Sequence, residues 1–306
     1  MIRDLLVGST GFVGGNIMRS HEFSASCHSI NVQSVYDSNP NLCVYAGVPA
    51  SMFLANHNPE ADMNIMRSAR ENIRAINPKR LVLISSIAVY LDSRGKDENS
   101  IMQTEGLPAY GANRLQLEQW IREDYPEALI IRLPALYGLG LKKNFLYDLH
   151  NIIPTMLIPQ KYEALSRKSD LIRSSYSLHK DGVYHVSVQT EELKNFFRNN
   201  DFNALSFTDS RSKYQFYNLA RLWNDIYIGL EHELLLLNIC TPPVSAKKVY
   251  ECITGDSNWN NELDKTPFDY DMRTIHADKF SSDGMYLCSQ ESELNDILSF
   301  MKAWSD

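Results

Sequence analysis

Residues 4–14 read DLLVGSTGFVG, a short apolar run that leads directly into glycines at positions 8, 11 and 14. The pattern predicts a buried strand over residues 4–7, a tight turn through the glycines and a helix over residues 13–20. Glycine lets a backbone approach a pyrophosphate closely, and the positive end of the following helix favours the phosphate charge. The stretch therefore predicts a dinucleotide-binding loop, with a bare turn as the alternative.

The rest of the first half alternates short apolar runs with helix-like segments. Further strands are expected at residues 42–46, 80–85 and 129–133. Helices are expected at residues 62–76 and 110–124. Near-continuous apolar strands such as LVLIS (81–85) indicate burial on both faces, which is typical of a sheet covered by helices on each side. The order predicts an α/β protein with a Rossmann-type, doubly wound parallel sheet.

The alternation of strand-like and helix-like segments weakens after Pro134. It returns with a predicted helix at residues 216–230 and a predicted buried strand at LLLLNIC (234–240). We therefore expect a dinucleotide-binding domain over residues 1–140 that the chain re-enters at about 214–240. Residues 141–213 and 241–306 are then expected to form a smaller α+β, substrate-binding lobe.

Composition narrows the class of protein. The chain has 306 residues, with 30 basic and 37 acidic side chains, and the net charge of -7 argues against a nucleic-acid or anionic-membrane surface. Five cysteines without a CxxC pair are typical of free thiols in a reducing compartment, and the histidines show no metal-ligand spacing, so no metal is predicted. No apolar run approaches the roughly 20 residues that span a bilayer, and Arg3 and Asp4 lead directly into the strand-like LLVGS (5–9) rather than into an apolar signal segment. A cytoplasmic location is predicted.

Polar side chains are expected at the carboxyl edge of the sheet. ISSIAVY (84–90) ends a buried strand, so Ser85 and Ser86 lie where open α/β sheets bind ligands. Tyr110 begins the next predicted helix, and Arg114 follows one turn later on the same face.

These motifs together resemble the extended branch of the short-chain dehydrogenase/reductase family, which contains nucleotide-sugar epimerases, dehydratases and reductases. That family has a GxxGxxG loop, a strand ending in Ser-Ser-x-x-Val-Tyr, and a YxxxK helix, in which Arg114 takes the lysine position here. Further matching stretches are MNIMRSA (63–69), Ala46-Gly47, RLPALYGLG (132–140), LNICTPP (237–243) and residues 270–301. The resemblance thus covers nearly the whole chain.

The resemblance implies roles for four catalytic residues. Tyr110 would exchange a proton with a substrate oxygen while hydride passes to or from a nicotinamide, Ser86 would hydrogen-bond the same oxygen, and Asn64 would belong to the catalytic group. A free tyrosine has a pKa of about 10, so a nearby cation is needed to favour the phenolate. Arg114 would supply that cation and bond the nicotinamide ribose, although its fork is bulkier than an ammonium. The alternative is a surface arginine paired with Glu118 at i+4.

The implied cofactor is NAD or NADP. The implied contacts are Gly8, Thr10, Gly11, Phe12, Val13, Gly14, Ser29, Ala46, Gly47, Ser85, Tyr110, Arg114 and Leu133. The segment ASCHSIN (25–31) lacks the acidic residue or arginine that would separate NAD from NADP, so both stay open.

The implied substrate is a nucleotide-activated sugar, with Asn144, Arg211 and Arg273 as candidate contacts in the second lobe; solvated surface charge is the alternative for the two arginines. Family dehydratases carry Asp-Glu where Ile87 and Ala88 stand, which favours epimerisation or carbonyl reduction. The resemblance thus implies an NAD(P)-dependent nucleotide-sugar epimerase or reductase that forms a homodimer. The competing hypothesis is a non-catalytic dinucleotide-binding or sensor protein.

Overall fold

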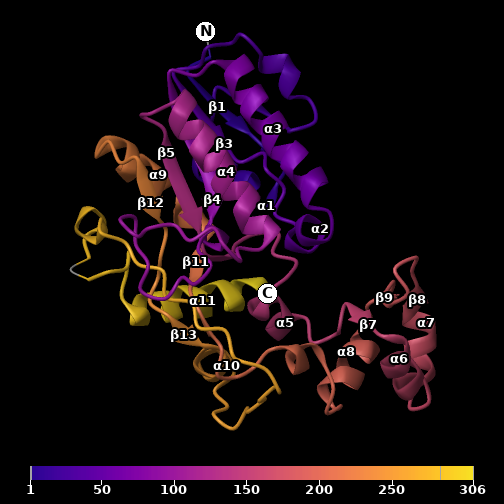
Figure 1. Cartoon of the computed structure of the whole chain (residues 1–306). Coiled ribbons are helices and arrows are strands. Elements are labelled where there is room, and N and C mark those ends of the chain that lie inside the picture. Colours follow the sequence, from indigo (N-terminus) through magenta and orange to yellow (C-terminus); the bar gives the residue numbers. More distant parts are fainter. Residues whose placement is uncertain (1, 283, 306) are drawn as a thin grey trace. The chain divides into compact units, whose positions relative to one another are not determined.

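The computed structural model describes residues 2–282 and 284–305, which form two compact units (Figure 1). Unit 1 contains the chain up to Gly140 together with Lys213–Val244 and Asp269–Ile297. Unit 2 contains Leu141–Ser212, Ser245–Phe268 and the segment from Leu298 onward.

A six-stranded parallel sheet forms the centre of unit 1, in the order β12-β5-β4-β3-β1-β2. The strands are β1 (Asp4–Val7), β2 (Ala25–Cys27), β3 (Leu42–Tyr45), β4 (Arg80–Ser86), β5 (Leu129–Leu133) and β12 (Leu236–Asn238). The strand order reverses between β1 and β3, and ligands of open α/β sheets bind outside the carboxyl ends of the strands at such a point. The predicted Rossmann-type fold is confirmed, and its switch point identifies the edge of the sheet that can hold a ligand.

Helices cover both faces of this sheet. They are α1 (Phe12–Ser20), α3 (Pro59–Ile76), α4 (Ala109–Asp124) and α9 (Leu222–Glu231). Leu5 packs in one core cluster with Ile73 of α3 and Ile121 of α4, whereas the next residue, Leu6, packs in another with Ile17 of α1 and Ile226 of α9. Successive strand residues point to opposite faces, so each apolar strand supplies both clusters.

Shorter elements complete unit 1. They are η1 (Val32–Val35), α2 (Met52–His57), η2 (Ile87–Val89), β6 (Ala135–Tyr137), β10 (Lys213–Tyr214), β11 (Phe216–Asn218), η4 (Leu219–Arg221) and η5 (Ala277–Phe280). β13 (Val244–Ser245) and α11 (Gln290–Ser305) run across unit boundaries.

The prediction of a single helix over residues 216–230 is wrong. β11 pairs in parallel with β6, and the chain then forms η4 before α9 begins. The side chain of Asn218 accepts a hydrogen bond from the N–H of Ala220, which starts η4. Tyr217 is buried and donates to the carboxylate of Asp225 at 2.5 Å, so tertiary contacts decide the conformation here.

The expected second lobe also needs correction, because Asp269–Ile297 belongs to unit 1. The buried side chain of Gln215 donates to the carbonyl oxygens of Thr241 and Met272 at 2.6 and 2.7 Å. Its own oxygen accepts the N–H of Met272 at 2.7 Å. These bonds tie the late segment to the middle of the chain.

Unit 2 has its own small core. A three-stranded antiparallel sheet of order β7-β9-β8 is formed by β7 (Met156–Leu157), β8 (Tyr176–Leu178) and β9 (Tyr184–Val186). The helices are α5 (Phe145–His150), α6 (Pro159–Ser166), α7 (Asp170–Ser175), α8 (Glu191–Arg198) and α10 (Ala246–Thr254), with η3 (Ala204–Phe207). Leu157, Ile172 and Phe197 are buried together in its core.

Burial of an acidic side chain in unit 1 has a consequence for stability. Glu293, in the first turn of α11, has no exposed surface. Burial raises the pKa of Glu293 to about 8, and the nearby charge of Asp296 acts in the same direction. The folded protein therefore keeps this carboxyl protonated at neutral pH.

Glu293 predicts a pH-dependent stability. In the unfolded chain its carboxyl loses the proton near pH 4.5, so between about pH 4.5 and 8 the folded state binds more protons than the unfolded state. The contribution of Glu293 to the free energy of unfolding is therefore fully present below this window. It falls as pH rises through the window, by up to about 1.4 kcal/mol per pH unit. Urea unfolding at pH 5 to 8 should show this slope in the wild type and a flatter one in Glu293→Gln. Glu291→Gln, an exposed residue on the same turn, is the control; parallel curves for wild type and Glu293→Gln would refute the effect.

Candidate functional site

The glycine loop forms a cradle at the carboxyl end of β1. Gly8 has a φ of +92°, and a Cβ there would lie 2.5 Å from the carbonyl oxygen of Ala46 at the end of β3. A Cβ on Gly14 would overlap the carbonyl oxygen of Gly8. Gly11 is the N-cap of α1 and offers no side chain to its first-turn N–H groups. The loop thus leaves the positive end of a nine-residue helix uncapped beside the switch point.

The end of β2 lies beside this loop. The carbonyl oxygen of Cys27 accepts the N–H groups of Gly8 and Ser9 at 2.8 and 3.2 Å. Thr10 Oγ1 and His28 Nδ1 share a hydrogen bond of 2.8 Å, and Ser29 is exposed in the turn that follows. The small and polar residues expected at this end of the sheet are therefore together, without an acidic side chain among residues 25–31.

Ser86 and Tyr110 come from neighbouring segments at the same edge. Ser86 ends β4, and its Oγ accepts the N–H of Ala88 at 3.2 Å. Tyr110 lies in the first turn of α4, next to Gly111, where a Cβ would overlap the carbonyl oxygen of Ala88. This close approach presses the start of α4 onto the turn that follows Ser86. The side chain of Tyr110 is buried, and its hydroxyl makes no hydrogen bond with the residues that the structure describes.

Ser85 does not offer its hydroxyl to the site. Its Oγ donates to the carboxylate of Glu118 on α4 at 2.5 Å, and Glu118 accepts Arg132 of β5 at 2.6 Å. Arg132 also donates to the hydroxyl of Tyr90 at 2.7 Å. These four side chains are buried, and burial raises the pKa of Tyr90. The expected contact between the Ser85 side chain and the cofactor is therefore corrected. Neighbouring strand residues face opposite ways, and Ser85 faces Glu118.

Arg114 is buried and fully engaged on its terminal nitrogens. Nη1 and Nη2 donate to the two carboxylate oxygens of Asp62 at 2.6 and 3.1 Å. They also donate to the carbonyl oxygens of Tyr110 at 3.1 Å and Pro49 at 2.7 Å. The guanidinium carbon lies 3.7 Å from the ring centroid of Tyr110, so the cation stacks on the ring face. The alternative pairing with Glu118 is not formed.

Asn64 is not part of this cluster. It lies exposed on α3, where its side-chain oxygen accepts Arg67 Nη1 at 2.6 Å. Asp62, two residues earlier and about 200° around the helix, is buried against α4 instead. Asp62 is therefore the residue of α3 that contacts Arg114, and a catalytic role of Asn64 stays a prediction.

Two residues that contact Arg114 or Tyr110 were not predicted from the sequence. Asp62 shares the buried stripe of α3 with Met66 and Ile73, and a carboxylate on an apolar stripe indicates a buried partner. That signal could have identified Asp62. Asn56, whose side-chain oxygen accepts the N–H of Tyr110 at 2.9 Å, has no comparable signal.

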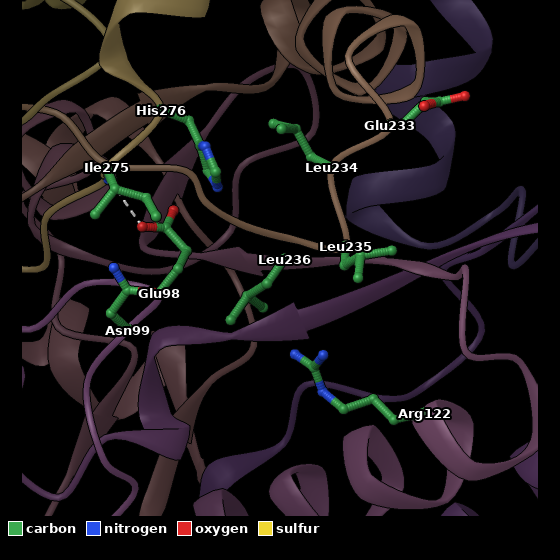
Figure 2. A pocket seen from close by; sticks show the side chains of 9 residues that line it. All are labelled: Glu98, Asn99, Arg122, Glu233, Leu234, Leu235, Leu236, Ile275 and His276. Carbon is green, nitrogen blue, oxygen red and sulfur yellow. Dashed lines mark hydrogen bonds between the residues drawn. The ribbon is translucent and has the colours of Figure 1, made fainter.

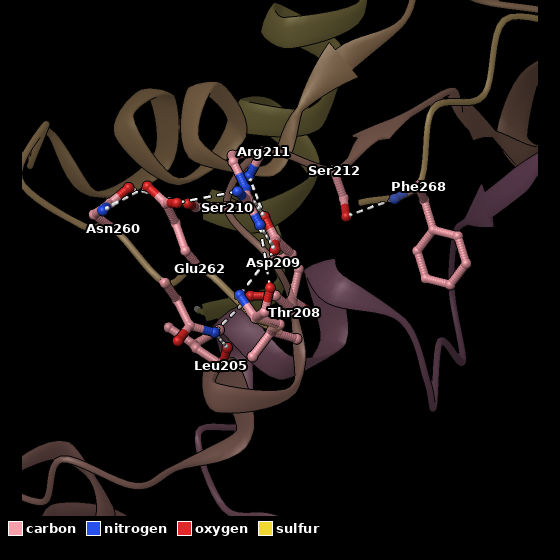
Figure 3. Close-up of polar contacts among 11 residues, drawn as sticks. Leu205, Thr208, Asp209, Ser210, Arg211, Ser212, Asn260, Glu262 and Phe268 are labelled. Carbon is pink, nitrogen blue, oxygen red and sulfur yellow. Dashed lines mark hydrogen bonds and ion pairs between the residues drawn. The ribbon is translucent and has the colours of Figure 1, made fainter. Parts of the chain in front are cut away.

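The candidate substrate contacts are distributed over both units. Asn144 has a φ of +110° and caps α5 in unit 2 through the N–H of Tyr147. Arg211, also in unit 2, forms a two-pronged pair with buried Asp209 and a further contact of 3.0 Å with Glu262 (Figure 3). Arg273 belongs to unit 1 rather than the second lobe and pairs with Asp271 at 2.8 Å. Both arginines are thus already paired with carboxylates.

A shallow depression of about 450 Å³ lies beside edge strand β12 (Figure 2). Leu236 there pairs with Ile130, at the end of β5 opposite the one that pairs with Ser86. The carboxylate of Glu98 in this depression already accepts Thr274 Oγ1 at 2.6 Å. The depression is therefore separate from the carboxyl-edge site.

Two kinds of feature are absent from the described part of the chain. None of its helices is long and apolar enough to span a membrane. Residues 2–282 and 284–305 also contain no group of three or more histidine, cysteine or acidic side chains that could hold a metal ion.

No protein-family model matches the chain, and no curated protein matches its sequence. Solved structures do match. The dTDP-4-dehydrorhamnose reductase of Bacillus anthracis, solved with NADP, is 14% identical with a TM-score of 0.62, and the match covers 98% of each chain. The UDP-glucose 4-epimerase of Thermotoga maritima, solved with UDP-glucose, is 12% identical with a TM-score of 0.61 over 100% of each chain. TunA, an NAD-dependent NDP-hexosamine 5,6-dehydratase, is 14% identical with a TM-score of 0.61 over 99% of this chain and 98% of its own.

These likenesses show the fold. They confirm, at the level of fold, the resemblance to nucleotide-sugar epimerases, reductases and dehydratases that the motifs predicted. The particular chemistry of this chain is a separate matter, since one fold serves many reactions.

Adjacent glycines in α1 test the cradle. Gly14→Ala should destabilise the protein by about 1–3 kcal/mol, because its Cβ would overlap the carbonyl of Gly8. Gly15→Ala is the matched control: its Cβ would lie 3.6 Å from the carbonyl oxygen of Ser9, an ordinary contact, and the change should stabilise by about 0.4–1 kcal/mol. Thermal and urea unfolding measure both. Equal effects at the two positions would contradict the described loop.

Proposed function

We propose that this protein is an NAD(P)-dependent nucleotide-sugar epimerase or reductase. The observation that carries the proposal is the packing of Gly111 against Ala88, which brings Tyr110 and Ser86 to the same sheet edge as the glycine cradle. A hydroxyl and a phenol beside a dinucleotide loop form a group suited to proton exchange with a substrate oxygen.

The cradle fits a dinucleotide. The approach of Gly14 to Gly8 and the uncapped start of α1 provide close backbone access and N–H donors for a pyrophosphate. Thr10, Phe12, Val13, Ser29, Ala46, Gly47 and Leu133 stay proposed contacts. The bound nicotinamide would supply or accept hydride. His28, Ser29 and Asn31 at the end of β2 leave both NAD and NADP as candidates.

The chain's own groups then have defined tasks. Ser86 Oγ accepts the N–H of Ala88, which leaves its O–H to donate to a substrate oxygen. Tyr110 would give its phenolic proton to that oxygen during reduction, or take one during oxidation. Its burial limits competition from water, which strengthens a hydrogen bond made there.

A nucleotide-linked sugar is the proposed substrate. Asn144, Arg211 and Arg273 stay candidates for contacting it, and an arginine that does so must share its carboxylate partner or exchange it for the ligand. Half-buried Ile87 and Ala88 follow Ser86 and offer no acid or base, which disfavours dehydration. A cytoplasmic location and a homodimer stay predictions.

One observation favours the second candidate, a dinucleotide-binding protein without catalysis. The cation at the family's lysine position is paired with Asp62 and lies over the ring of Tyr110 instead of donating to its hydroxyl. A bound dinucleotide with no turnover would fit this arrangement.

Binding and turnover separate these functions. The wild type should bind NADH or NADPH in a fluorescence titration and convert at least one member of a panel of UDP-, GDP- and dTDP-sugars and their 4-keto forms. Tyr110→Phe should keep the binding and lose about 10²–10⁴-fold in turnover, because a positioned acid or base is removed. Tyr227→Phe, an exposed tyrosine on α9, should change neither.

Net consumption of the reduced cofactor would indicate a reductase, whereas sugar inversion without net consumption would indicate an epimerase. Binding without conversion of any sugar would support the sensor instead. Failure to bind either dinucleotide would refute both.

A further inference from the structure

The Asp62–Arg114 ion pair links three segments that meet at Tyr110. Asp62 lies on α3, Arg114 and Tyr110 lie on α4, and Pro49 lies in the segment after β3. The side chains of Asp62 and Arg114 are 9% and 5% exposed, so the pair is shielded from water.

The geometry around Arg114 leaves it little freedom. Four hydrogen bonds, two to Asp62 and one each to Tyr110 and Pro49, match the four N–H bonds of its terminal nitrogens. Asn113 donates to the same Asp62 carboxylate at 2.9 Å and to the carbonyl of Pro59 at 3.0 Å. The carboxylate is therefore itself held, and the guanidinium plane is set by it.

We propose that Asp62 is a positioning residue for Tyr110: it holds the Arg114 guanidinium against the ring of Tyr110, so that the phenol is fixed at the start of α4, the end of the helix that packs on the turn after Ser86. The proposal rests on the function proposed for Tyr110. Asn56 of α2 fixes the backbone of the same residue through the Tyr110 N–H, whereas the ring is held by Arg114 of α4, which Asp62 of α3 orients in turn.

The pair acts through orientation rather than through an uncompensated positive charge. The carboxylate of Asp62 lies 2.6 Å from Nη1, so the two charges largely cancel at longer range. A lysine ammonium, a point charge on a flexible stem, could not bond both carboxylate oxygens, reach Pro49 and cover the ring together. Arginine at this position thus has a different role from the family's lysine, because it orients the ring of Tyr110 rather than supplying a free positive charge.

Stability alone is a weak reason for such a pair. Burying two charges costs several kcal/mol per ion, and a well-packed apolar pair often serves as well. The α3–α4 contact also has a second bridge, in which Asp124 accepts Arg70 at 2.7 and 2.9 Å and Arg74 at 2.8 Å. That bridge provides a matched control, because it joins the same two helices without touching Tyr110.

The experiment compares Asp62→Asn with Asp124→Asn in the full chain. Tyrosines labelled with ¹³C report the ring environment in the protein without ligand, and Tyr110→Phe assigns the Tyr110 signal. Unfolding by urea, NADPH binding, kcat and KM are measured on the same samples. Arg114→Lys is the second variant, in case Asp62→Asn does not fold.

Asp62→Asn should move the Tyr110 signal and lower kcat by about tenfold or more, with NADPH affinity and KM little changed, since a small misplacement of a reacting group is costly. Asp124→Asn should leave the Tyr110 signal and kcat unchanged. Arg114→Lys should move the signal and lower kcat. In a Tyr110→Phe background, Asp62→Asn should cost no further kcat, because its effect passes through the phenol.

An unmoved Tyr110 signal in both Asp62→Asn and Arg114→Lys would overturn the proposal. So would equal losses in Asp62→Asn and Asp124→Asn, or an undiminished loss in the Tyr110→Phe background. Because the signal is read without substrate, failure of the positioning role can be told apart from failure of the proposed function. A moved signal in a protein that converts no sugar would support the positioning role and refute the proposed catalysis.

Discussion

The buried contact between Asp62 and Arg114 is the constraint on which the site depends. It joins α3 to α4, holds a cation on the ring of Tyr110 and reaches the carbonyl of Pro49 beyond β3. Removing one partner of such a pair leaves an uncompensated buried charge, which is far more costly than removing an exposed pair. The position of the phenol is therefore coupled to the packing of two helices and a loop, rather than to the side-chain rotamer of Tyr110 alone.

The sheet supplies the frame for this contact. The reversal of strand order between β1 and β3 puts the glycine cradle at the carboxyl edge, and the register of β4 with β5 puts Ser86 opposite Leu133 at that edge. Gly111 then lets α4 press against the turn after β4. Backbone approach brings the polar groups to one edge, while the buried ion pair fixes the orientation of one of them. The network of Ser85, Glu118 and Arg132 ties the same helix to β4 and β5 from the inner side.

The sequence was sufficient for the elements with strong local signals. The strands at residues 4–7 and 129–133 have the predicted bounds, because continuous apolar runs between turn residues leave few alternatives. Partners distant in sequence could not be predicted in this way. Arg114 pairs with a residue 52 positions away instead of Glu118, and the local helix pattern of residues 216–230 was overridden at Tyr217 by pairing and a buried hydrogen bond. Ser85 and Ser86 could not be given separate roles until the direction of each side chain was known.

A crystal structure of the complex with NADPH tests the central claim most directly, through the distances around Arg114. The account predicts that the two Asp62–Arg114 hydrogen bonds and the stacking of Arg114 on Tyr110 persist when the dinucleotide is bound. An Arg114 side chain that leaves Asp62 and donates to the nicotinamide ribose would contradict it, and would make this arginine a direct replacement for the lysine.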